Sequence, residues 1–549
     1  MEVPTPAVSA GGPAAGLRQQ LGPDVRAGFL VFLIALPLGL AISKASGFPP
    51  VAGILTAIIG GMVVTLVGGP GLTIKGPAAG LIVVAAGAVQ ELGRGDALLG
   101  YRLTLAVVVA AGVLQILFGL LRAGALADFF PSAAMYGMMA SIGLTVSLKQ
   151  LFVITGTSPV AQEPLRLLGE VPGAFAHLNP GVFCIGMVSL ALLFGLPLLR
   201  QPLVRKIPVQ LLVLLVSVPL GRYFGLGHAH TYLFLARHHY SLGPEFLVSL
   251  PTSLSQAVTL PDFTQIFSGV SLKYIGLFAL VGSLESLLSA QAVDLLAPTG
   301  RRKADLNRDL LGVGVGNVLA GLVGGLPMIA EIVRSSANVA AGARTRWANF
   351  FHGLFLLGFV AVGSQLLTQI PLAALGALLL HIGFRLAGPR QFARMFRIGG
   401  EQLLIFLTTI AVTLATDLLV GIGAGIVSKL LIHLLRGLPL RSVFTVRTEL
   451  LDLPDGGYLV KVRDAAVFSN YLSLKTQLAP LPKGKHVVLD LSDTRLVDHT
   501  VLEHLERFRA DYLRDGGQLE ITGLQRHLPV SGYPTAARVR AEAVNLASA

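Results

Sequence analysis

The chain of 549 residues is 53% hydrophobic and only 13% charged, and its mean hydropathy is +0.72. Soluble domains average about 25% charged residues, so a single water-soluble domain is excluded. The net charge of +13 does not indicate a nucleic-acid-binding protein, because Lys and Arg gather in connections such as 301–303 and 385–397, where they set membrane orientation. The single cysteine, Cys184, excludes an intrachain disulfide and a cysteine metal cluster.

Residues 1–22 are rich in Ala, Gly and Pro. They lack the charged start and cleavage pattern of a signal peptide, so we expect a flexible cytoplasmic tail. The transmembrane domain is predicted to cover residues 23–436.

Apolar segments near the ~20 residues needed to cross a bilayer recur from Ala27 to Leu435. They predict fourteen spans: 27–43, 51–67, 76–92, 104–121, 133–155, 181–199, 208–220, 272–293, 310–325, 330–341, 347–366, 370–387, 400–415 and 418–435. An even number of spans, with basic clusters on the side of the C-terminal domain, predicts that both termini are cytoplasmic.

Two of these segments are too short to span alone, one opening at 75–80 and one at 330–341, and each follows a Gly/Pro break. Ahead of the breaks, Leu66-Val-Gly-Gly69 recurs 256 residues later as Leu322-Val-Gly-Gly325, and this ungapped match places Lys75 opposite Glu331. Such interruptions in corresponding parts of two halves indicate an inverted-repeat transporter whose binding site lies between two half-helices. The repeats are expected at about 24–220 and 272–435.

Beyond residue 436 the composition becomes that of a soluble domain. Strands are predicted at 458–463, 486–491 and 518–522, with an amphipathic helix over 497–514. This alternation predicts a small α/β domain over 437–549 with a disordered end.

Charged side chains inside spans cost roughly 2.5–3.5 kcal/mol each on insertion scales, so each needs a reason. Glu285 lies mid-span, and Ser289 follows one helical turn later. Hard cations and protons need oxygen ligands and a titratable carboxyl, so the pair predicts cation or proton coupling. A protonated Glu285 that hydrogen-bonds a neighbouring helix is the alternative.

The second short segment carries Glu331, Arg334 and Ser335. A half-helix N-terminus offers free N–H donors, and a guanidinium there adds forked donors suited to a planar oxyanion. The residues predicted to bind the anion are Lys75, Gly76, Pro77, Ala78, Ala79, Ile332, Val333, Arg334 and Ser335, with Glu331 joining Glu285 and Ser289 in coupling. The alternative is that Arg334 only pairs structurally with Glu331 or Glu285.

No cofactor is expected beyond a coupling Na⁺ or H⁺, with sodium at Glu285 and Ser289 as the only candidate metal. His228, His230, His238 and His239 share one connection, but their spacing fits no standard zinc site and indicates a solvated loop. The sequence contains no P-loop, dinucleotide fingerprint or nucleophile elbow, so an enzyme is not expected.

Several segments together resemble the SulP family of anion transporters over about residues 20–525. They are the Asp24-to-Phe29 stretch with Leu36-Pro37-Leu-Gly39, the Gly76-Pro77 half-helix, the Asn338-to-Thr345 stretch ending Ala-Gly-Ala-Arg-Thr, and the α/β tail. The resemblance implies two inverted seven-span repeats, core and gate domains, a cytoplasmic STAS domain and a homodimer. It leaves the substrate open, since members carry bicarbonate, sulfate, chloride or dicarboxylates.

The resemblance also implies roles for individual residues. Arg334 matches the anion-coordinating arginine of the animal branch, which includes the prestin-like motor proteins. Glu285 and Ser289 match the Asp and Thr of the sodium-coupled bicarbonate branch, while Glu is what proton-coupled members use. In the tail, Asp498-His499-Thr500 stands where bacterial anti-sigma-antagonist relatives have Asp-Ser-Ser, and His499 breaks that motif, which favours a structural or partner-docking role over a phosphorylation switch.

The sequence therefore predicts an elevator-type secondary transporter of a small inorganic anion in the cell (inner) membrane, bicarbonate ahead of sulfate, coupled to sodium or protons. The partners expected are the anion, the bilayer, a second copy of the chain and a cytoplasmic protein at the STAS domain, without nucleic acid. Two alternatives stay open within transport, a passive anion channel and a chloride/anion exchanger. A membrane-anchored STAS signalling platform is the alternative from another class.

Overall fold

The computed structural model describes residues 13–69, 71–161, 163–198, 208–234, 238–249, 258–296, 304–416, 418–454, 456–478, 480–482, 484–514 and 516–540. The basic run 301–303 lies outside them. The chain forms two compact units, one of residues 1–123 and 179–378 and one of 124–178 and 379–549. The predicted domain border at 436 does not coincide with either division and stays a prediction.

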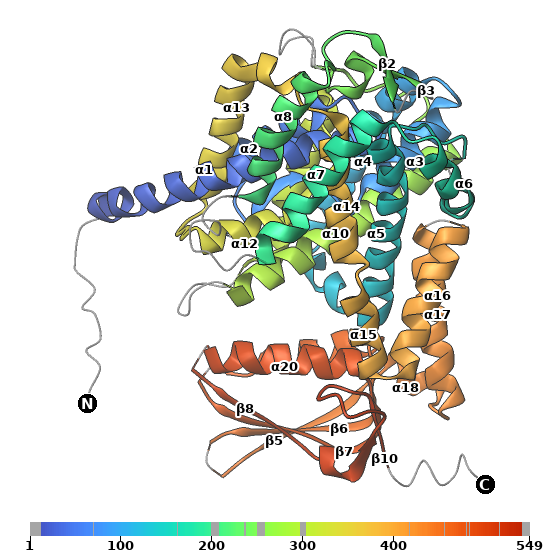
Figure 1. The fold of residues 1–549 in the computed structure, drawn as a ribbon. Coiled ribbons are helices and arrows are strands. Elements are labelled where there is room, and N and C mark those ends of the chain that lie inside the picture. The colour runs from blue at the N-terminus through green and yellow to red at the C-terminus, as the bar shows by residue number, and fades with distance from the viewer. Residues whose placement is uncertain are drawn as a thin grey trace. The chain divides into compact units, whose positions relative to one another are not determined.

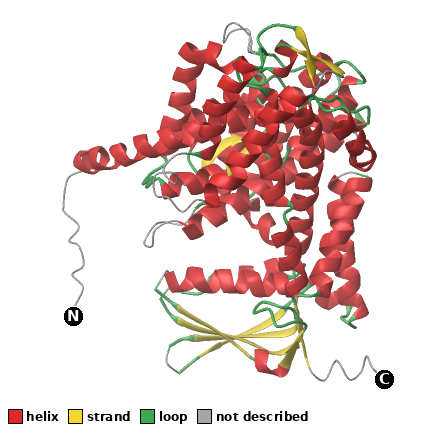
Figure 2. Cartoon of the chain, in the orientation of Figure 1, coloured by secondary structure: helices red, strands yellow, loops and turns green. Residues whose placement is uncertain are grey.

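The first unit is mostly helical (Figures 1 and 2). Its helices are α1 (Pro13–Ala45), α2 (Val51–Val67), α3 (Ile82–Gly93), α4 (Ala97–Leu120), α7 (Pro180–Gly195), η2 (Leu196–Leu198), α8 (Val209–Tyr223), η4 (Pro244–Phe246), α10 (Gly269–Leu296), α11 (Leu306–Val323), α12 (Ile332–Ala340), α13 (Trp347–Leu367) and the start of α14 (Leu372–Leu386). Its strands are β1 (Ile74–Pro77), β2 (His230–Phe234), β3 (His238–Leu242) and β4 (Met328–Glu331).

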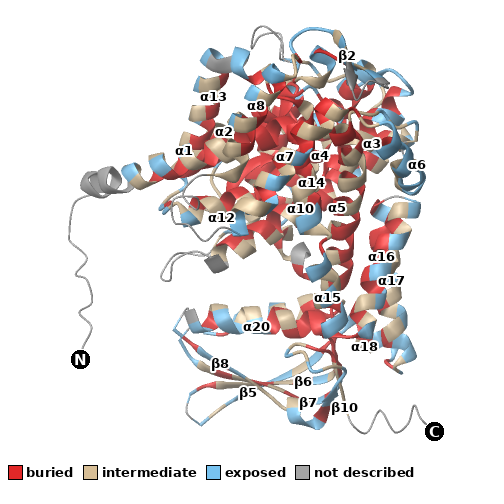
Figure 3. Ribbon diagram, in the orientation of Figure 1, coloured by how far each residue is buried: buried red, intermediate tan, exposed pale blue. Residues whose placement is uncertain are grey.

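Each of the fourteen predicted spans contains a helix, and seven described helices are long and apolar enough to cross a membrane. The expected tail of residues 1–22 needs correction, because α1 already begins at Pro13. Proline is tolerated in the first turn of a helix, and the Ala, Leu, Arg and Gln residues that follow are strong helix formers. Figure 3 shows long buried stretches along helices such as α2 and α4.

The two interrupted segments meet in a short antiparallel ribbon. Strand β1 pairs with β4, in the register Ile74 to Glu331 and Pro77 to Met328, so Lys75 lies opposite Ala330. The strands begin 254 residues apart (328 minus 74), two fewer than the spacing of the Gly-Gly pairs. The ungapped alignment of Lys75 with Glu331 is therefore wrong, because the second repeat has two residues fewer between its Gly-Gly pair and its strand.

The second unit combines membrane helices with the C-terminal α/β domain. Its helices are η1 (Ala123–Asp128), α5 (Ser132–Thr155), α6 (Pro164–Ala176), α15 (Pro389–Ile398), α16 (Gly400–Ala415), α17 (Leu418–Leu435), α18 (Leu440–Phe444), α19 (Tyr471–Leu478), α20 (His499–Arg514) and η5 (Leu524–Arg526). Its strands are β5 (Arg447–Asp452), β6 (Tyr458–Ala466), β7 (His486–Val497), β8 (Gln518–Thr522), β9 (His527–Pro529) and β10 (Arg538–Arg540).

The three strands and the helix predicted for the tail are all present as β6, β7, β8 and α20. The strands pair in the order β5-β6-β7-β10-β9, and β8 pairs with the first half of β7. Helix α20 lies along one face of this sheet (Figure 1), where Val501 and Leu505 join a core with Leu489 and Val462. Apolar side chains on alternate residues of β6 and β7 supply that core.

Helix α20 also contacts the start of membrane helix α5. The hydroxyl of Thr500, fully buried, accepts a hydrogen bond from the Ser132 N–H at 3.2 Å, and Glu503 Oε2 accepts one from Ser132 Oγ at 2.7 Å. Because α5 has no side-chain cap of its own, Thr500 supplies one, and Glu503 fixes the side chain of Ser132. This arrangement supports the structural role expected for Thr500 and leaves its hydroxyl inaccessible to a modifying enzyme.

Asp498 connects the same end of α20 to helix α17. Its carboxylate accepts hydrogen bonds from Phe468 N–H and Val501 N–H, both at 2.8 Å, and lies 3.9 Å from Lys429 Nζ and 3.6 Å from His433 Nε2. Burial disfavours the charged form, but Lys429, His433 and the two N–H groups outweigh it and hold the pKa of Asp498 below its ordinary value. The stabilisation is therefore present above the unfolded pKa of about 3.9 and is lost as the pH falls below it.

We expect Asp498→Ala to lower the melting temperature of the purified protein, because it removes a helix cap and leaves the buried Lys429 without a counter-charge. Breaking a buried pair costs roughly 3–5 kcal/mol. Asp498→Asn, which can keep the cap, should cost less. Asp493→Ala, at an exposed position of β7, is the matched control. Equal melting of Asp498→Ala and wild type would contradict this role.

Candidate anion site

The site is built around the β1–β4 ribbon, from which both half-helices start. Helix α12 begins directly after β4, and four residues separate β1 from the start of α3. Neither N-terminus has a side-chain hydrogen-bonding cap. Among the described residues, the backbone N–H groups of Ala79 and Gly80 also have no hydrogen-bond partner. The ribbon is therefore flanked by free backbone donors, as an anion requires.

Arg334 is the third residue of α12, and its side chain returns toward the ribbon. The side chain is fully buried, and Nε lies 3.4 Å from Glu331 Oε2. None of its three guanidinium nitrogens has a hydrogen-bond partner among the described residues. A Cβ on Gly76 would lie 2.4 Å from Arg334 Nη1, so glycine is required for this approach. Buried donors without acceptors are rare and need an explanation, which a bound anion would supply.

Glu285 approaches the same segment at its other end. A Cβ on Gly80 would lie 1.8 Å from Glu285 Oε1, so the carboxylate of α10 rests against the backbone of Gly80. Glu285 and Glu331 are close enough to interact electrostatically. Gly76 and Gly80 thus mark two contacts four residues apart, one with the fixed cation and one with the carboxylate.

Ser289 and Ser335 have different surroundings. Ser289 is buried one turn along α10 from Glu285. The Ser335 hydroxyl accepts from Ile74 N–H at 2.8 Å and donates to the Glu331 carbonyl, so it fixes β1 to α12. Ala78 donates its N–H to the Pro327 carbonyl at 3.1 Å. Ser335 and Ala78 therefore shape the ribbon, and their roles as direct ligands stay predictions.

Lys75 points to the opposite face of β1 from Gly76, since side chains alternate along a strand. It forms a buried ion pair with Asp309 of α11, whose second oxygen accepts from Ser286 Oγ at 2.6 Å. Ser286 Oγ in turn accepts from the Ala330 N–H of β4 at 3.0 Å. The structure thus separates Lys75 from Arg334 and ties it to a network that holds both strands.

Two residues of this region, Asp309 and His352, were not predicted from the sequence. Asp309 stands just before a predicted span, where an acid resembles an ordinary helix start. His352 of α13 is fully buried, has no partner for either ring nitrogen among the described residues, and lies close enough to Arg334 to interact electrostatically. A histidine in the middle of an apolar segment was the available signal for it.

The Ala-Gly-Ala-Arg-Thr stretch contacts helix α1 through hydrogen bonds. Asp24 of α1, fully buried, accepts hydrogen bonds from Arg344 N–H and Thr345 N–H at 2.7 and 3.0 Å and also pairs with the Thr345 hydroxyl. The interaction joins two segments of the first unit that are 320 residues apart.

The described residues contain no group of three or more His, Cys, Asp or Glu side chains that could hold a metal ion. This search covers the described histidines of the β2–β3 hairpin.

The comparisons with known proteins agree with this architecture. The family model described as "Sulfate permease family" matches residues 21–409, well over half of the chain. The chain belongs to the sulfate permease family. Two relatives of this family are the bicarbonate transporter BicA of Picosynechococcus, 25% identical over 405 residues (73% of this chain and 68% of that one), and sulfate transporter 4.1, chloroplastic, of Arabidopsis thaliana, 22% identical over 549 residues (92% and 76%).

Solved structures extend the sulfate permease comparison to the fold. The transmembrane domain of a cyanobacterial BicA superposes with a TM-score of 0.61 at 25% identity, covering 74% of this chain and 97% of that one. SLC26A9 superposes with a TM-score of 0.64 at 15% identity and covers 97% and 86%. The predicted fold is confirmed, a helical membrane protein with a C-terminal α/β domain of the STAS kind.

Proposed function

We propose that the chain is a secondary-active transporter of a small inorganic anion, with bicarbonate preferred over sulfate and with transport coupled to sodium or protons. The observation that carries the proposal is the fully buried Arg334 guanidinium, whose three nitrogens have no hydrogen-bond acceptor in the described part of the chain. The named substrates of the two relatives, bicarbonate and sulfate, are both oxyanions and support this substrate class.

The anion would bind between the Arg334 guanidinium and the free N–H groups of the two half-helix starts. A planar guanidinium fits an oxyanion with two parallel hydrogen bonds. The N–H groups of Ile332 and Val333 on one side, and of Ala79 and Gly80 on the other, add donors without side chains in the way. Gly76 has no side chain, which lets the Arg334 guanidinium reach the ribbon.

The charges of the site support coupling. Glu285, Glu331 and Arg334 together carry a net charge of −1 when all three are ionised, and an added monoanion would bring it to −2. A buried site cannot hold that charge without compensation. A proton on Glu285, or a sodium ion held by Glu285 and Ser289, would return the charge to the −1 of the empty site, so anion and cation would bind together.

The net charge of Glu285, Glu331 and Arg334 also favours a monoanion over a dianion as the substrate. Bicarbonate brings the three-residue site to −2 and sulfate brings it to −3. Bicarbonate therefore needs one compensating cation fewer than sulfate. This argument and the similarity to BicA support the proposed order of bicarbonate before sulfate.

All the groups invoked, from Gly76 and Gly80 to Glu285 and Arg334, belong to the first compact unit. A site that is complete within one unit can move with it as a rigid body, which supports an elevator-type mechanism. The homodimer, the inner membrane and the cytoplasmic termini are parts of the same proposal. A passive channel or a signalling platform would not need a buried carboxylate beside a buried arginine. We therefore favour the transporter over both alternatives.

The test is uptake into proteoliposomes that contain the full-length protein. Radiolabelled bicarbonate and sulfate are supplied separately, with sodium and proton gradients imposed one at a time. We expect accumulation of bicarbonate above equilibrium with one of the two gradients and weaker uptake of sulfate. Uptake that only equilibrates under every gradient would show a channel, and preferred sulfate accumulation would reverse the order of substrates.

A further inference from the structure

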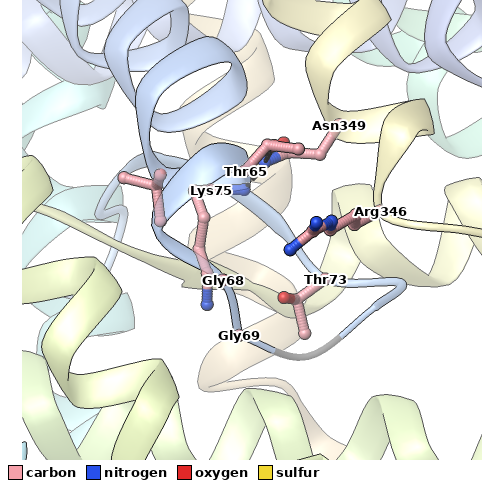
Figure 4. Close-up of a pocket in the computed structure, with 8 residues that line it drawn as sticks. Thr65, Gly68, Gly69, Thr73, Lys75, Arg346 and Asn349 are labelled. Carbon is pink, nitrogen blue, oxygen red and sulfur yellow. Dashed lines mark hydrogen bonds between the residues drawn. The ribbon is translucent and has the colours of Figure 1, made fainter.

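A small cavity that two cationic side chains line lies on the other face of β1, away from Arg334. It is lined by Thr65, Gly68, Gly69, Thr73, Lys75 and Arg346, with Val64 and Asn349 completing the wall. Figure 4 shows the Lys75 ammonium, the Arg346 guanidinium and the Thr73 hydroxyl directed toward one space beside the glycine pair. All of these residues belong to the first compact unit.

The two cationic side chains keep donors for a ligand. Lys75 pairs with Asp309, but an ammonium has three N–H donors, so two remain. Arg346 is exposed, and among the described residues no carboxylate pairs with it. A Cβ on Gly68 would meet only Arg346 Nη1, at 4.0 Å, so the space in front of the guanidinium is open. Lys75, Asp309 and Arg346 together carry a charge of +1, which one monoanion neutralises.

The corresponding place in the second repeat shows that the fold does not require this opening. There the glycine pair is Gly324-Gly325, and the Tyr101 hydroxyl donates to the Gly324 carbonyl at 2.7 Å. A Cβ on Gly324 would lie 2.7 Å from the Tyr101 hydroxyl, and one on Gly325 would lie 2.8 Å from Thr56 Oγ1. The second repeat fills the space with side chains, whereas the first leaves it open and lines it with cations.

We propose that this cavity is a second anion site, distinct from the site at Arg334, and that it binds a single chloride ion, since its space is about that of one water molecule. Lys75 and Arg346 supply the positive charge. Lys75 and Gly76 are neighbours in β1 and face opposite sides of the strand. The bound anion would therefore contact β1 on the Lys75 side, while Arg334 contacts it on the Gly76 side. Binding at this cavity can be measured without transport, so the inference does not depend on the proposed function.

The test is isothermal titration of the purified full-length protein with chloride. We expect two binding events for wild type and loss of one, by at least tenfold in affinity, in Arg346→Gln. Arg308→Gln is the matched control, since this nearby arginine is exposed and, among the residues that the structure describes, pairs with Asp305 within its own turn. It should retain both events.

Arg334→Gln separates this inference from the proposed function. It should remove the event that survives in Arg346→Gln and leave the other in place. Two unchanged binding events in Arg346→Gln would overturn the second site. Two unchanged events in Arg334→Gln, with one lost in Arg346→Gln, would overturn the transport site and leave the second site standing.

Discussion

Arg334→Ala is expected to weaken anion binding by at least ~30-fold while the protein stays folded. Removing one partner of a buried, charge-assisted contact costs on the order of 2–5 kcal/mol, and Arg334 is the fixed positive charge in contact with the ribbon. Arg334→Lys should recover only part of the loss, since a point charge on a flexible stem cannot make the forked contact of a guanidinium. Titration with bicarbonate, beside melting temperatures, measures both effects.

The competing interpretation is that Arg334 only neutralises Glu331, which lies 3.4 Å away. In that case Arg334→Ala should chiefly destabilise the protein, and adding Glu331→Gln should restore both melting temperature and binding. Arg308→Ala serves as the control for removal of an exposed arginine of the same unit. Near-normal affinity in the Arg334→Ala, Glu331→Gln double variant would exclude a role in anion binding.

Much of the membrane fold could be predicted because its signals are local. Hydropathy located all fourteen helical segments, and the Gly/Pro breaks located both half-helices. The pairing of β1 with β4 could not be read, because a four-residue strand leaves no periodicity, and the loss of two residues before β4 shifted the apparent register. Contacts such as Thr500 with Ser132, 368 residues apart, leave no trace in one sequence.

The site was predicted unevenly for a related reason. Glu285 and Arg334 are charges inside apolar segments, which makes them visible, and the structure brings both to the Gly76–Gly80 segment. Lys75 is equally visible, yet the sequence could not say that it faces away from Arg334, because this depends on the alternation of a strand that was not recognised. Its partner Asp309 was overlooked because an acid at a helix start has an ordinary explanation.

Glu285→Gln is expected to abolish gradient-driven accumulation while anion still binds and the protein still folds. The amide keeps the size of the carboxyl group against Gly80 but can neither release a proton nor balance a sodium ion. It also fixes the site in the charge state that Glu285 has when protonated, so anion affinity should become independent of sodium and of pH. Uptake into proteoliposomes under imposed sodium and proton gradients gives the first result, and titration at several pH values gives the second.

The matched control is Glu91→Gln, which removes an exposed carboxylate that pairs with Lys273 at 3.1 Å. It should leave accumulation unchanged. If Glu285→Gln vesicles still accumulate anion with the wild-type cation dependence, the carboxylate is only a structural group and the charge balance must come from elsewhere. Because Glu331 is the other buried carboxylate beside Arg334, Glu331→Gln would then be the next variant expected to lose coupling. Wild-type accumulation in both variants would leave these two carboxylates without a part in coupling.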